Sequence, residues 1–376
     1  MSDSREFDFA IVGGGVIGLS IAWEMAQDDN RVALVERDRV GRQASWAGAG
    51  ILPPSNMDTA RHALEYLAAL SFQQHPLWAE QLKKETGIDT GFRQCGAVFV
   101  ARTAGEVAAL RGQCEEWRET EITTEELSQQ DLIQLMPALA GQAPSIRLAV
   151  HVLTEAQLRN PDHLQALRAG CEGRGVQFFE QVGEIQMHSD AKKRRNEIRL
   201  QDGTMLLANK VCIAAGVWSE LLLKQFDVSI STIPVRGQML LFKLPQPKFT
   251  QIVYEGTRYI VPRDDGHVLA GSTLEEAGFD DSTTPQGVAD LLRFANGLFA
   301  ELNEETLVDS WAGLRPASFD GFPYIGRVPN SWNVWAATGH FRSGLLLSTG
   351  TAKMVANLMQ GCRMLMDVMP FRLDRG

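Results

Sequence analysis

The chain has 376 residues, enough for two domains and a large core, and its 44% apolar and 22% charged residues are typical of a soluble globular protein. The formal net charge of −10 argues against general nucleic-acid binding, which depends on neutralisation of phosphates by Lys and Arg. No apolar run reaches the ~18 residues of a membrane span. The five cysteines are odd in number and lack C-x-x-C spacing, so we expect a cytoplasmic protein with reduced thiols and no metal site.

The first twenty-seven residues carry a glycine-rich turn in a specific setting. Residues 7–12 form a short apolar run typical of a buried parallel strand, and a helical stretch covers residues 19–27. Between them, Gly13, Gly15 and Gly18 satisfy G-x-G-x-x-G. In that pattern the first glycine permits the tight turn, the second lets the backbone approach a pyrophosphate, and the third lets the helix pack on the strand. The free N–H groups of the helix N-terminus complete a predicted dinucleotide site.

The next segment distinguishes FAD from NAD. A second strand at 32–35 ends in Glu36, whose carboxylate can accept hydrogen bonds from ribose hydroxyls. A polar loop at 37–43 is followed by small residues and glycines at 44–52. An NAD-binding domain usually continues into another helix and strand, whereas a small-residue loop lets backbone lie against a large flat ring. The sequence therefore favours a flavin.

Further elements follow in chain order up to residue 219. Proline, glycine and the spacing of apolar residues set the expected ends of each element. We read a solvated hairpin turn in the basic run 192–195, because a charge run is usually a solvent-facing one. The expected elements are a helix at 57–85, strands within 91–102, helices at 106–118, from 123–126 to 136 and at 162–174, strands at 176–179, 184–188, 197–200 and 206–213, and a helix beginning near Trp218.

The second half of the chain has a different pattern of predicted elements. Strands at 236–244, 251–261 and 267–272 alternate as antiparallel strands do, and one amphipathic helix spans 286–302. A region rich in glycine and proline begins at Trp311. The last elements are a strand at 334–337, a glycine-rich junction at 338–344 and a helix at 345–359 that Gly361 ends.

These elements predict two domains of mixed α/β and α+β class. A discontinuous Rossmann-like FAD-binding domain is expected at 1–85, 150–225 and 311–376. A substrate-binding domain with an antiparallel sheet is expected at 86–149 and 226–310.

Several motifs resemble the D-amino-acid oxidase family of flavoenzymes, and within it the glycine oxidases. The resemblance covers nearly the whole chain, and its specific parts are Gly-Leu-Arg-Pro at 313–316 and Gly-His-Phe-Arg-Ser-Gly at 339–344. Supporting parts are the fingerprint at 9–18, Glu36-Arg37, and the stretches 47–52, 259–263, 311–316, 320–326 and 371–375.

The resemblance implies an FAD enzyme that oxidises small amines, including glycine, sarcosine and small D-amino acids, to the imine. Dioxygen then reoxidises the flavin and gives hydrogen peroxide, and the glycine oxidases serve thiamine synthesis. A branch of relatives attaches FAD through a cysteine, and because 311–318 contains none, we expect non-covalent FAD. Relatives also imply a homo-oligomer, a tetramer in the resembling enzymes.

Three residues are candidates for binding the substrate. Arg315 is expected in a turn bounded by glycine and proline, where its guanidinium can grip a carboxylate with two parallel hydrogen bonds. Tyr259 can add a hydrogen bond to that carboxylate. Arg342 is expected to contact the substrate or to neutralise the reduced flavin. Thr257 and Leu274 stand where pocket-lining side chains differ among relatives, and they bear on substrate size.

The candidate cofactor residues come from segments distributed along the chain. We expect His340 to contribute its backbone rather than act as a general base, because a neutral amine can lose hydride from Cα directly. The full set is Gly13, Gly15, Val16, Ile17, Gly18, Glu36, Arg37, Ala44, Ser45, Ala49, Gly50, Ile51, Val182, Ala215, Gly216, Trp218, Gly313, His340, Phe341, Arg342, Ser343, Gly344, Leu345 and Leu346.

Two classes of function stay open. One is an independent amine or amino-acid oxidase, with a sarcosine or D-amino-acid oxidase or dehydrogenase as the alternative within enzymes. The other is a flavin-bearing subunit that works only in a larger complex.

Overall fold

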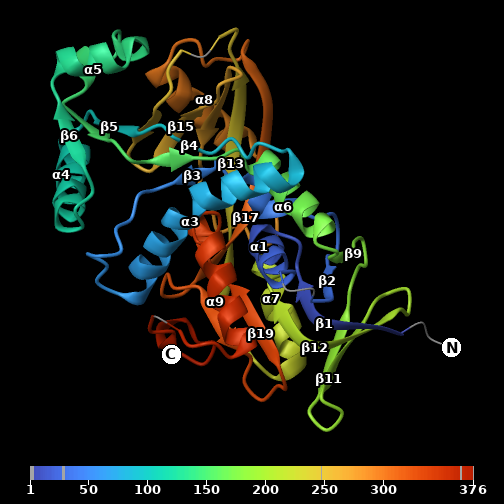
Figure 1. Ribbon diagram of the computed structural model, residues 1–376. Coiled ribbons are helices and arrows are strands. Elements are labelled where there is room, and N and C mark those ends of the chain that lie inside the picture. The colour runs from blue at the N-terminus through green and yellow to red at the C-terminus, as the bar shows by residue number, and fades with distance from the viewer. Residues whose placement is uncertain (1–3, 28–29, 247, 365, 376) are drawn as a thin grey trace.

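The computed structural model describes residues 4–27, 30–246, 248–364 and 366–375, arranged around two large sheets (Figure 1). The first sheet occupies the lower part of that view and the second the upper part. A small sheet of β3 (Ile51–Leu52), β8 (Ala156–Gln157) and β4 (Arg93–Gln94) lies between them. The expected combination of a Rossmann-like sheet and an antiparallel-type sheet is confirmed.

The first sheet is mainly parallel. Five parallel strands run in the order β19 (Val334–Thr338), β12 (Met205–Ile213), β1 (Ser4–Val12), β2 (Val32–Val35) and β9 (Gln177–Phe179). Antiparallel strands extend it: β10 (Gln186–Asp190), β11 (Arg195–Arg199) and β18 (Tyr324–Arg327). The basic run 192–195 reaches from the turn joining β10 and β11 into the start of β11, so the predicted hairpin is confirmed.

Both faces of this sheet are covered. Phe9 and Ile11 of β1 pack in one core with α1 (Val16–Met25), α3 (Ala63–Thr86), α6 (Asn160–Gly173) and α9 (Ser348–Gln360). Ala10 and Val12 point to the opposite core, which contains α7 (Ser219–Leu223) and the β10–β11 hairpin. Burial on both faces explains why β2 and residues 9–12 of β1 are continuous apolar runs rather than alternating ones.

A buried histidine in the first core gives a prediction about stability. His163 on α6 is 1% exposed, and neither ring nitrogen has a partner among the described residues. Burial, and then the nearby His75, lower its pKa to about 3 from the usual 6.5. As the pH falls below about 6.5, this histidine therefore takes up a proton in the unfolded chain but stays neutral in the folded one. The free energy of unfolding then falls by ~1.4 kcal/mol per pH unit.

We expect His163→Phe to remove this contribution. Between pH 7 and pH 5, the free energy of unfolding should fall by about 2 kcal/mol less in the variant than in the wild type. Urea unfolding at the two pH values measures the difference. Equal pH dependence in both proteins would contradict the assignment, and exposed His188 supplies the control in His188→Phe.

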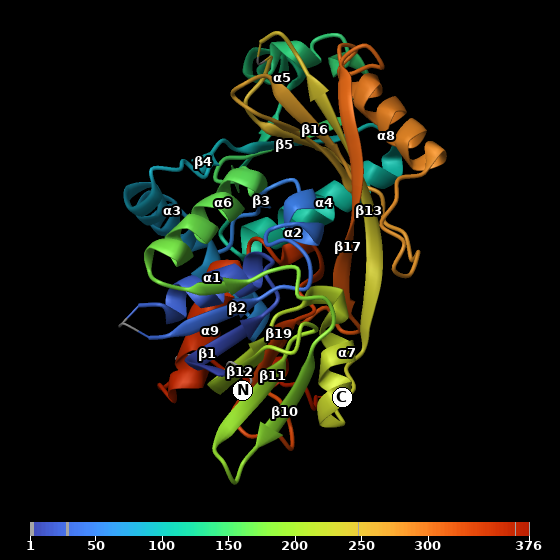
Figure 2. The same ribbon diagram turned by 90° about the vertical axis from the view of Figure 1, so that its right-hand side faces the viewer.

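The second sheet has eight strands, which are antiparallel except where β14 runs parallel to β5. Their order is β17 (Leu307–Ser318), β13 (Thr232–Lys243), β16 (His267–Gly271), β15 (Arg258–Pro262), β14 (Ile252–Glu255), β5 (Ala97–Ala101), β7 (Leu148–Val152) and β6 (Thr124–Leu127). Three helices lie in the segments that build this sheet: α4 (Ala104–Glu119), α5 (Gln129–Leu135) and α8 (Pro285–Leu298). Figure 2 shows β13 and β17 running from this sheet down beside the first one, as far as α7.

The expected region 123–126 is not the start of a helix. Residues 124–127 form β6, which pairs with β7, and the helix begins after Ser128. Ser128 and Asp131 form the real capping box, in which each side chain accepts a hydrogen bond from the other residue's backbone N–H. Cross-strand pairing thus overrides the helix-start pattern Thr-Thr-Glu-Glu.

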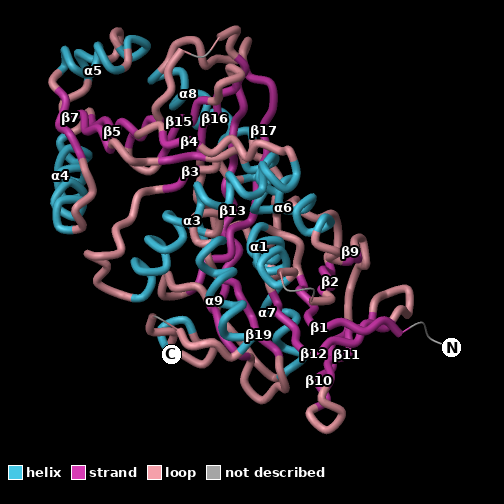
Figure 3. Tube along the Cα trace, in the orientation of Figure 1, coloured by secondary structure: helices cyan, strands magenta, loops and turns pink. Residues whose placement is uncertain are grey.

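Other elements also differ from those expected. The long helix begins at Ala63 instead of 57. The last helix begins at Ser348 instead of 345, because residues 344–347, which follow the short turn Phe341–Ser343, still form a turn. The small-residue stretch 44–52 contains a helical turn, α2 (Gln43–Ala47), instead of only loop. Figure 3 shows α3 and α9 as helices along the Cα trace, with loops between the elements.

The region after Trp311 is a strand. The sequence predicts a turn there because of Gly313 and Pro316, but both residues lie within β17. A proline is tolerated because β17 is the edge strand of the second sheet, next to β13. The domain boundaries expected at 150 and 311 thus fall inside β7 and β17, and we propose assigning both whole strands to the substrate-binding part.

Candidate functional site

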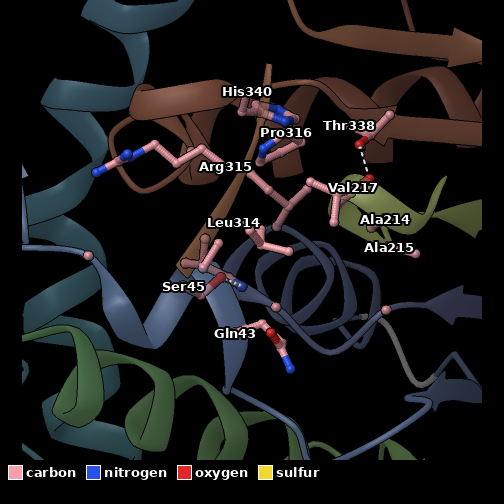
Figure 4. Close-up of a pocket in the computed structure, with 18 of the residues that line it drawn as sticks. Gln43, Ser45, Ala214, Ala215, Val217, Leu314, Arg315, Pro316, Thr338 and His340 are labelled. Atoms are coloured by element: carbon pink, nitrogen blue, oxygen red, sulfur yellow. Dashed lines mark hydrogen bonds between the residues drawn. The ribbon is translucent and has the colours of Figure 1, made fainter. Parts of the chain in front are cut away.

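A cavity of about 880 Å³ lies at the carboxyl ends of the parallel strands, where it also meets the second sheet. Open parallel sheets bind ligands at this edge, and the volume lies within the usual range for small-molecule sites. Segments far apart in sequence converge on it: Val12 and Val35, Ala214 to Trp218, and Ala337 to Leu346 apart from Gly339. Figure 4 shows Ser45, Ala215, Leu314 and His340 around this space.

The glycine turn after β1 is shaped by close backbone approaches. Gly13 has φ +114°, and a Cβ there would lie 2.4 Å from the carbonyl oxygen of Ala214. A Cβ on Gly18 would lie 1.9 Å from the carbonyl oxygen of Gly13. Gly13 and Gly15 line the cavity, whereas Gly18 does not and acts by letting α1 pack on the turn. Helix α1 then directs its N-terminus at the cavity, which suits a diphosphate.

The end of β2 carries a hydrogen-bonded acid. Glu36 lines the cavity, and its carboxylate accepts hydrogen bonds from the backbone N–H groups of Gly14 at 2.6 Å and Asp38 at 2.9 Å. Nearby, the Arg37 guanidinium lies 4.3 Å from the centre of the Trp218 ring. Arg37, Trp218 and Val182 all line this end of the cavity. The arrangement fits a ribose and an aromatic base.

The segment 43–51 forms the cavity wall next to the glycine turn. The Ser45 hydroxyl accepts a hydrogen bond of 2.9 Å from the Val16 backbone N–H, at the start of α1. Ala44, Ala49, Gly50 and Ile51 also line the wall. At Gly50 (φ +77°) a Cβ would lie 1.9 Å from the carbonyl oxygen of Leu158, so the two chains are in close contact.

Sequence reasoning missed Asn160, which lies just before the helix expected at 162–174. Asn160 lines the cavity and is 2% exposed, and its amide donates to the Ser45 carbonyl at 2.7 Å. Its Oδ1 is buried and lacks a hydrogen-bond partner among the described residues. A buried acceptor of this kind costs free energy unless a bound molecule supplies a donor. The orphan oxygen and the glycine cradle both fit FAD.

We expect Asn160→Ala to weaken FAD binding because it removes both this acceptor and the support of Ser45. One hydrogen bond of this kind is worth about 1–1.5 kcal/mol, so the dissociation constant should rise about 5- to 12-fold. Titration of the apoprotein with FAD, followed by flavin fluorescence, measures it. The exposed Asn296 on α8 offers the matched control Asn296→Ala, and equal affinities in all three proteins would exclude the assignment.

The junction before α9 approaches the cavity from the side of β19. His340 is 5% exposed, and its Nε2 lies 3.1 Å from the Thr351 hydroxyl. Burial lowers its pKa to about 3, so the imidazole is neutral and a weak base at neutral pH. Thr338 donates a 2.8 Å hydrogen bond to the Gly216 carbonyl, which joins the two glycine-rich junctions (Figure 4). Phe341, Arg342, Ser343, Gly344, Leu345 and Leu346 also line the cavity.

Arg315 enters the cavity from β17. Its guanidinium donates to the Ser272 hydroxyl at 2.9 Å and to the Thr273 carbonyl at 3.3 Å. A Cβ on Gly237 of the neighbouring strand would lie 2.1 Å from its nitrogens, so that glycine makes room for the side chain. Burial lowers the pKa of Arg315, the Tyr259 hydroxyl opposes this, and Arg342 adds to it. The three predicted substrate-binding residues are therefore close enough to interact.

The other two predicted residues differ in exposure. Tyr259 is 9% exposed and lines the cavity, with its hydroxyl 3.5 Å from the Met239 sulfur. Arg342 is exposed at the edge of the cavity and donates to the Thr257 carbonyl at 3.4 Å. Thr257 also lines the cavity, but Leu274 is 60% exposed and is not among the lining residues.

Of the predicted cofactor residues, only Gly18 and Gly313 are not among the lining residues. Gly313 has a packing role, because a Cβ there would lie 2.6 Å from the Ala47 Cβ. Phe99 and Tyr254, whose rings stack 4.3 Å apart, line the substrate end and were not predicted. No sequence motif marks them, because they come together only through the pairing of β5 with β14.

The described residues contain neither a group that could hold a metal ion nor a helix that could span a membrane. Within the described ranges, no three or more His, Cys, Asp or Glu side chains are grouped to hold a metal ion. No described helix is both long and apolar enough to cross a membrane.

Comparisons with known proteins agree with this geometry. The family model "FAD dependent oxidoreductase" (DAO) matches residues 8–358. A glycine oxidase of Pseudomonas aeruginosa is 35% identical over 373 residues, covering 96% of this chain and 97% of that one. The bifunctional protein ThiO/ThiG of Trichormus variabilis is 29% identical, covering 94% of this chain and 52% of that protein. A crystal structure of glycine oxidase from Geobacillus kaustophilus superposes with a TM-score of 0.91 at 31% identity, covering 99% of both chains.

Proposed function

Because the chain belongs to the DAO family of FAD-dependent oxidoreductases, we propose that it oxidises small amino acids such as glycine, sarcosine or a small D-amino acid. The products are the imine, which water hydrolyses to the 2-oxo acid and ammonia or an amine, and hydrogen peroxide. The observation that carries the proposal is the half-buried Arg315 guanidinium at the cavity beside Tyr259. The glycine oxidases among the relatives support the choice of substrate class.

Arg315 and Tyr259 bind and orient the substrate in this proposal. A guanidinium can hold both oxygens of a carboxylate, which fixes the direction of the Cα–H bond as well as the position of the substrate. The Ser272 hydroxyl and Thr273 carbonyl hold the guanidinium in place before the substrate arrives. Arg342 adds a second positive charge at the edge of the cavity, where it favours entry of an anionic group.

We propose that FAD is held non-covalently, with Glu36 at the ribose, Gly13 and Gly15 at the diphosphate and the 340–346 junction at the ring. When bound, FAD supplies the acceptor for the hydride that leaves Cα, and dioxygen takes the electrons on as hydrogen peroxide. The chain itself need not supply a strong base from His340, whose neutral imidazole is held by Thr351. Its carbonyl and amide groups, and those around it, shape the site.

A panel of amines tests the proposal. Under anaerobic conditions glycine, sarcosine or D-alanine should bleach the flavin absorbance of the holoenzyme, and peroxide should form at one equivalent per turnover in air. Bleaching without peroxide would assign a dehydrogenase instead. Failure of every amine in the panel would reject the oxidation proposal and favour a flavin-bearing subunit of a larger complex.

We also propose a cytoplasmic homo-oligomer that serves thiamine synthesis, and the resemblance to ThiO/ThiG supports that link. Light scattering measures the mass of the assembly. Loss of the gene should create a thiamine requirement if the pathway assignment is correct.

A further inference from the structure

A buried carboxyl group lies behind the substrate end of the cavity. Glu155, in the turn between β7 and β8, is 2% exposed, and its Oε1 accepts a short hydrogen bond from the Tyr254 hydroxyl. The backbone carbonyl of Glu155 accepts hydrogen bonds from the N–H groups of Cys95 at 3.1 Å and Gly96 at 2.9 Å. The main chain therefore fixes the carboxyl group behind Tyr254.

Tyr254 connects this carboxyl group to the cavity. It lines the cavity and pairs directly with Tyr259 across β14 and β15, so the two side chains lie on the same face of the sheet. Their rings are 6.2 Å apart in an edge-to-face arrangement. Because Tyr259 lies beside Arg315, a substrate carboxylate held there places its amine only two bonds further on, within the part of the cavity that Tyr254 lines.

The surroundings of the pair let the Glu155 carboxyl group gain or lose a proton near neutral pH. Burial raises the pKa of the Glu155 carboxyl to about 7, and the Tyr254 hydrogen bond opposes that rise. The Tyr254 pKa is raised well above its usual value by burial and by Glu155. The other titratable or charged groups that face the pair are Cys95, in the turn before β5, and Tyr259 and Arg342 beside Tyr254.

We propose that Glu155, acting through Tyr254, takes the proton that a zwitterionic substrate must lose from its ammonium group before oxidation. The N–H bond breaks and its electron pair stays on nitrogen. The Tyr254 oxygen accepts that proton and passes its own hydroxyl proton to Glu155 Oε1, so charge moves but no atom is oxidised. The neutral amine then holds the lone pair that forms the imine when hydride leaves Cα.

The proposal rests on the proposed amine oxidation, and its test is a pH profile of the holoenzyme. Glu155→Gln keeps a hydrogen-bonding side chain of the same size but cannot take up a proton. We expect kcat/KM for glycine to fall about 10²-fold at pH 7. It should return to within about threefold of the wild type above the pKa of the free amine, where the substrate arrives already deprotonated. Tyr254→Phe should give the same profile, while the exposed Glu126→Gln should follow the wild type.

An infrared titration of the holoenzyme without substrate gives a readout separate from turnover. A carboxyl band that titrates near neutral pH is expected in the wild type and Glu126→Gln and is absent in Glu155→Gln. A Glu155→Gln profile that matches the wild type, or that is lowered equally at every pH, overturns the proposal. If Glu155→Gln fails to retain FAD, Tyr254→Phe decides by the same criterion. If the wild type oxidises no amine, the proposed function fails, and the relay is rejected with it whatever the carboxyl band shows.

Discussion

Replacing Arg315 by alanine is expected to lower kcat/KM for glycine by about 10²- to 10³-fold. In the proposed function this guanidinium holds the substrate carboxylate, and losing one partner of a charge pair that the bound substrate buries costs about 3–4 kcal/mol, within the usual range of 2–5 kcal/mol. The Ser272 hydroxyl and Thr273 carbonyl that now accept from Arg315 would also lose their donor. Steady-state oxidation with peroxide detection measures the loss.

Two controls separate anchoring from general damage. Oxidation of a small amine without a carboxylate should be nearly unchanged in Arg315→Ala, because that substrate never used the guanidinium. Arg315→Lys keeps the charge but loses the two parallel donors, so it should recover only part of the activity. Unaltered glycine kinetics with full FAD occupancy would remove Arg315 from the substrate site.

The parts of the site that the sequence predicts are those built from local patterns. Gly13, Gly15 and Gly18 all lie within a six-residue segment, so the spacing of the glycines alone predicts the tight turn and the close backbone approach. The role of Glu36 is predicted from its position directly after the apolar strand at 32–35. The same holds for the junction at 340–346, because glycine next to a change from strand to helix predicts a backbone that lies close to a ligand.

What the sequence missed depends on long-range pairing. Glu155 and Tyr254 are 99 residues apart and Asn160 and Ser45 are 115 apart, so no local pattern indicates either contact. Arg315 lines the cavity, as the prediction requires, but it lies in a strand instead of the expected turn. Gly313 and Pro316 signal a turn, whereas the edge position of β17 and the close packing of Gly313 on Ala47 accommodate both residues in a strand. Here tertiary contacts override the local tendency of glycine and proline to form a turn.

The second large effect is expected in FAD binding, when the glycine-rich turn between β1 and α1 is changed. Gly18→Ala should raise the dissociation constant for FAD about 150-fold, which corresponds to about 3 kcal/mol, the upper end of the usual cost of overpacking. Its new Cβ would lie 1.9 Å from the Gly13 carbonyl oxygen and 3.0 Å from the Gly13 carbonyl carbon. Both are backbone atoms, so the clash is relieved only by moving α1 away from the turn. That movement displaces the Val16 N–H and the helix end that faces the diphosphate.

Gly105→Ala is the matched control, because Gly105 is exposed in α4 and a Cβ there meets nothing within 4 Å. It should bind FAD as the wild type does and be slightly more stable, since alanine favours the helix. Calorimetric titration of each apoprotein with FAD gives the affinities, and circular dichroism shows whether the fold is kept. Gly18→Ala that folds and binds FAD normally would show that the helix tolerates the shift. Gly18 lies outside the cavity lining, so loss of FAD in a folded variant would isolate helix placement, rather than direct contact, as the means by which this turn holds the cofactor.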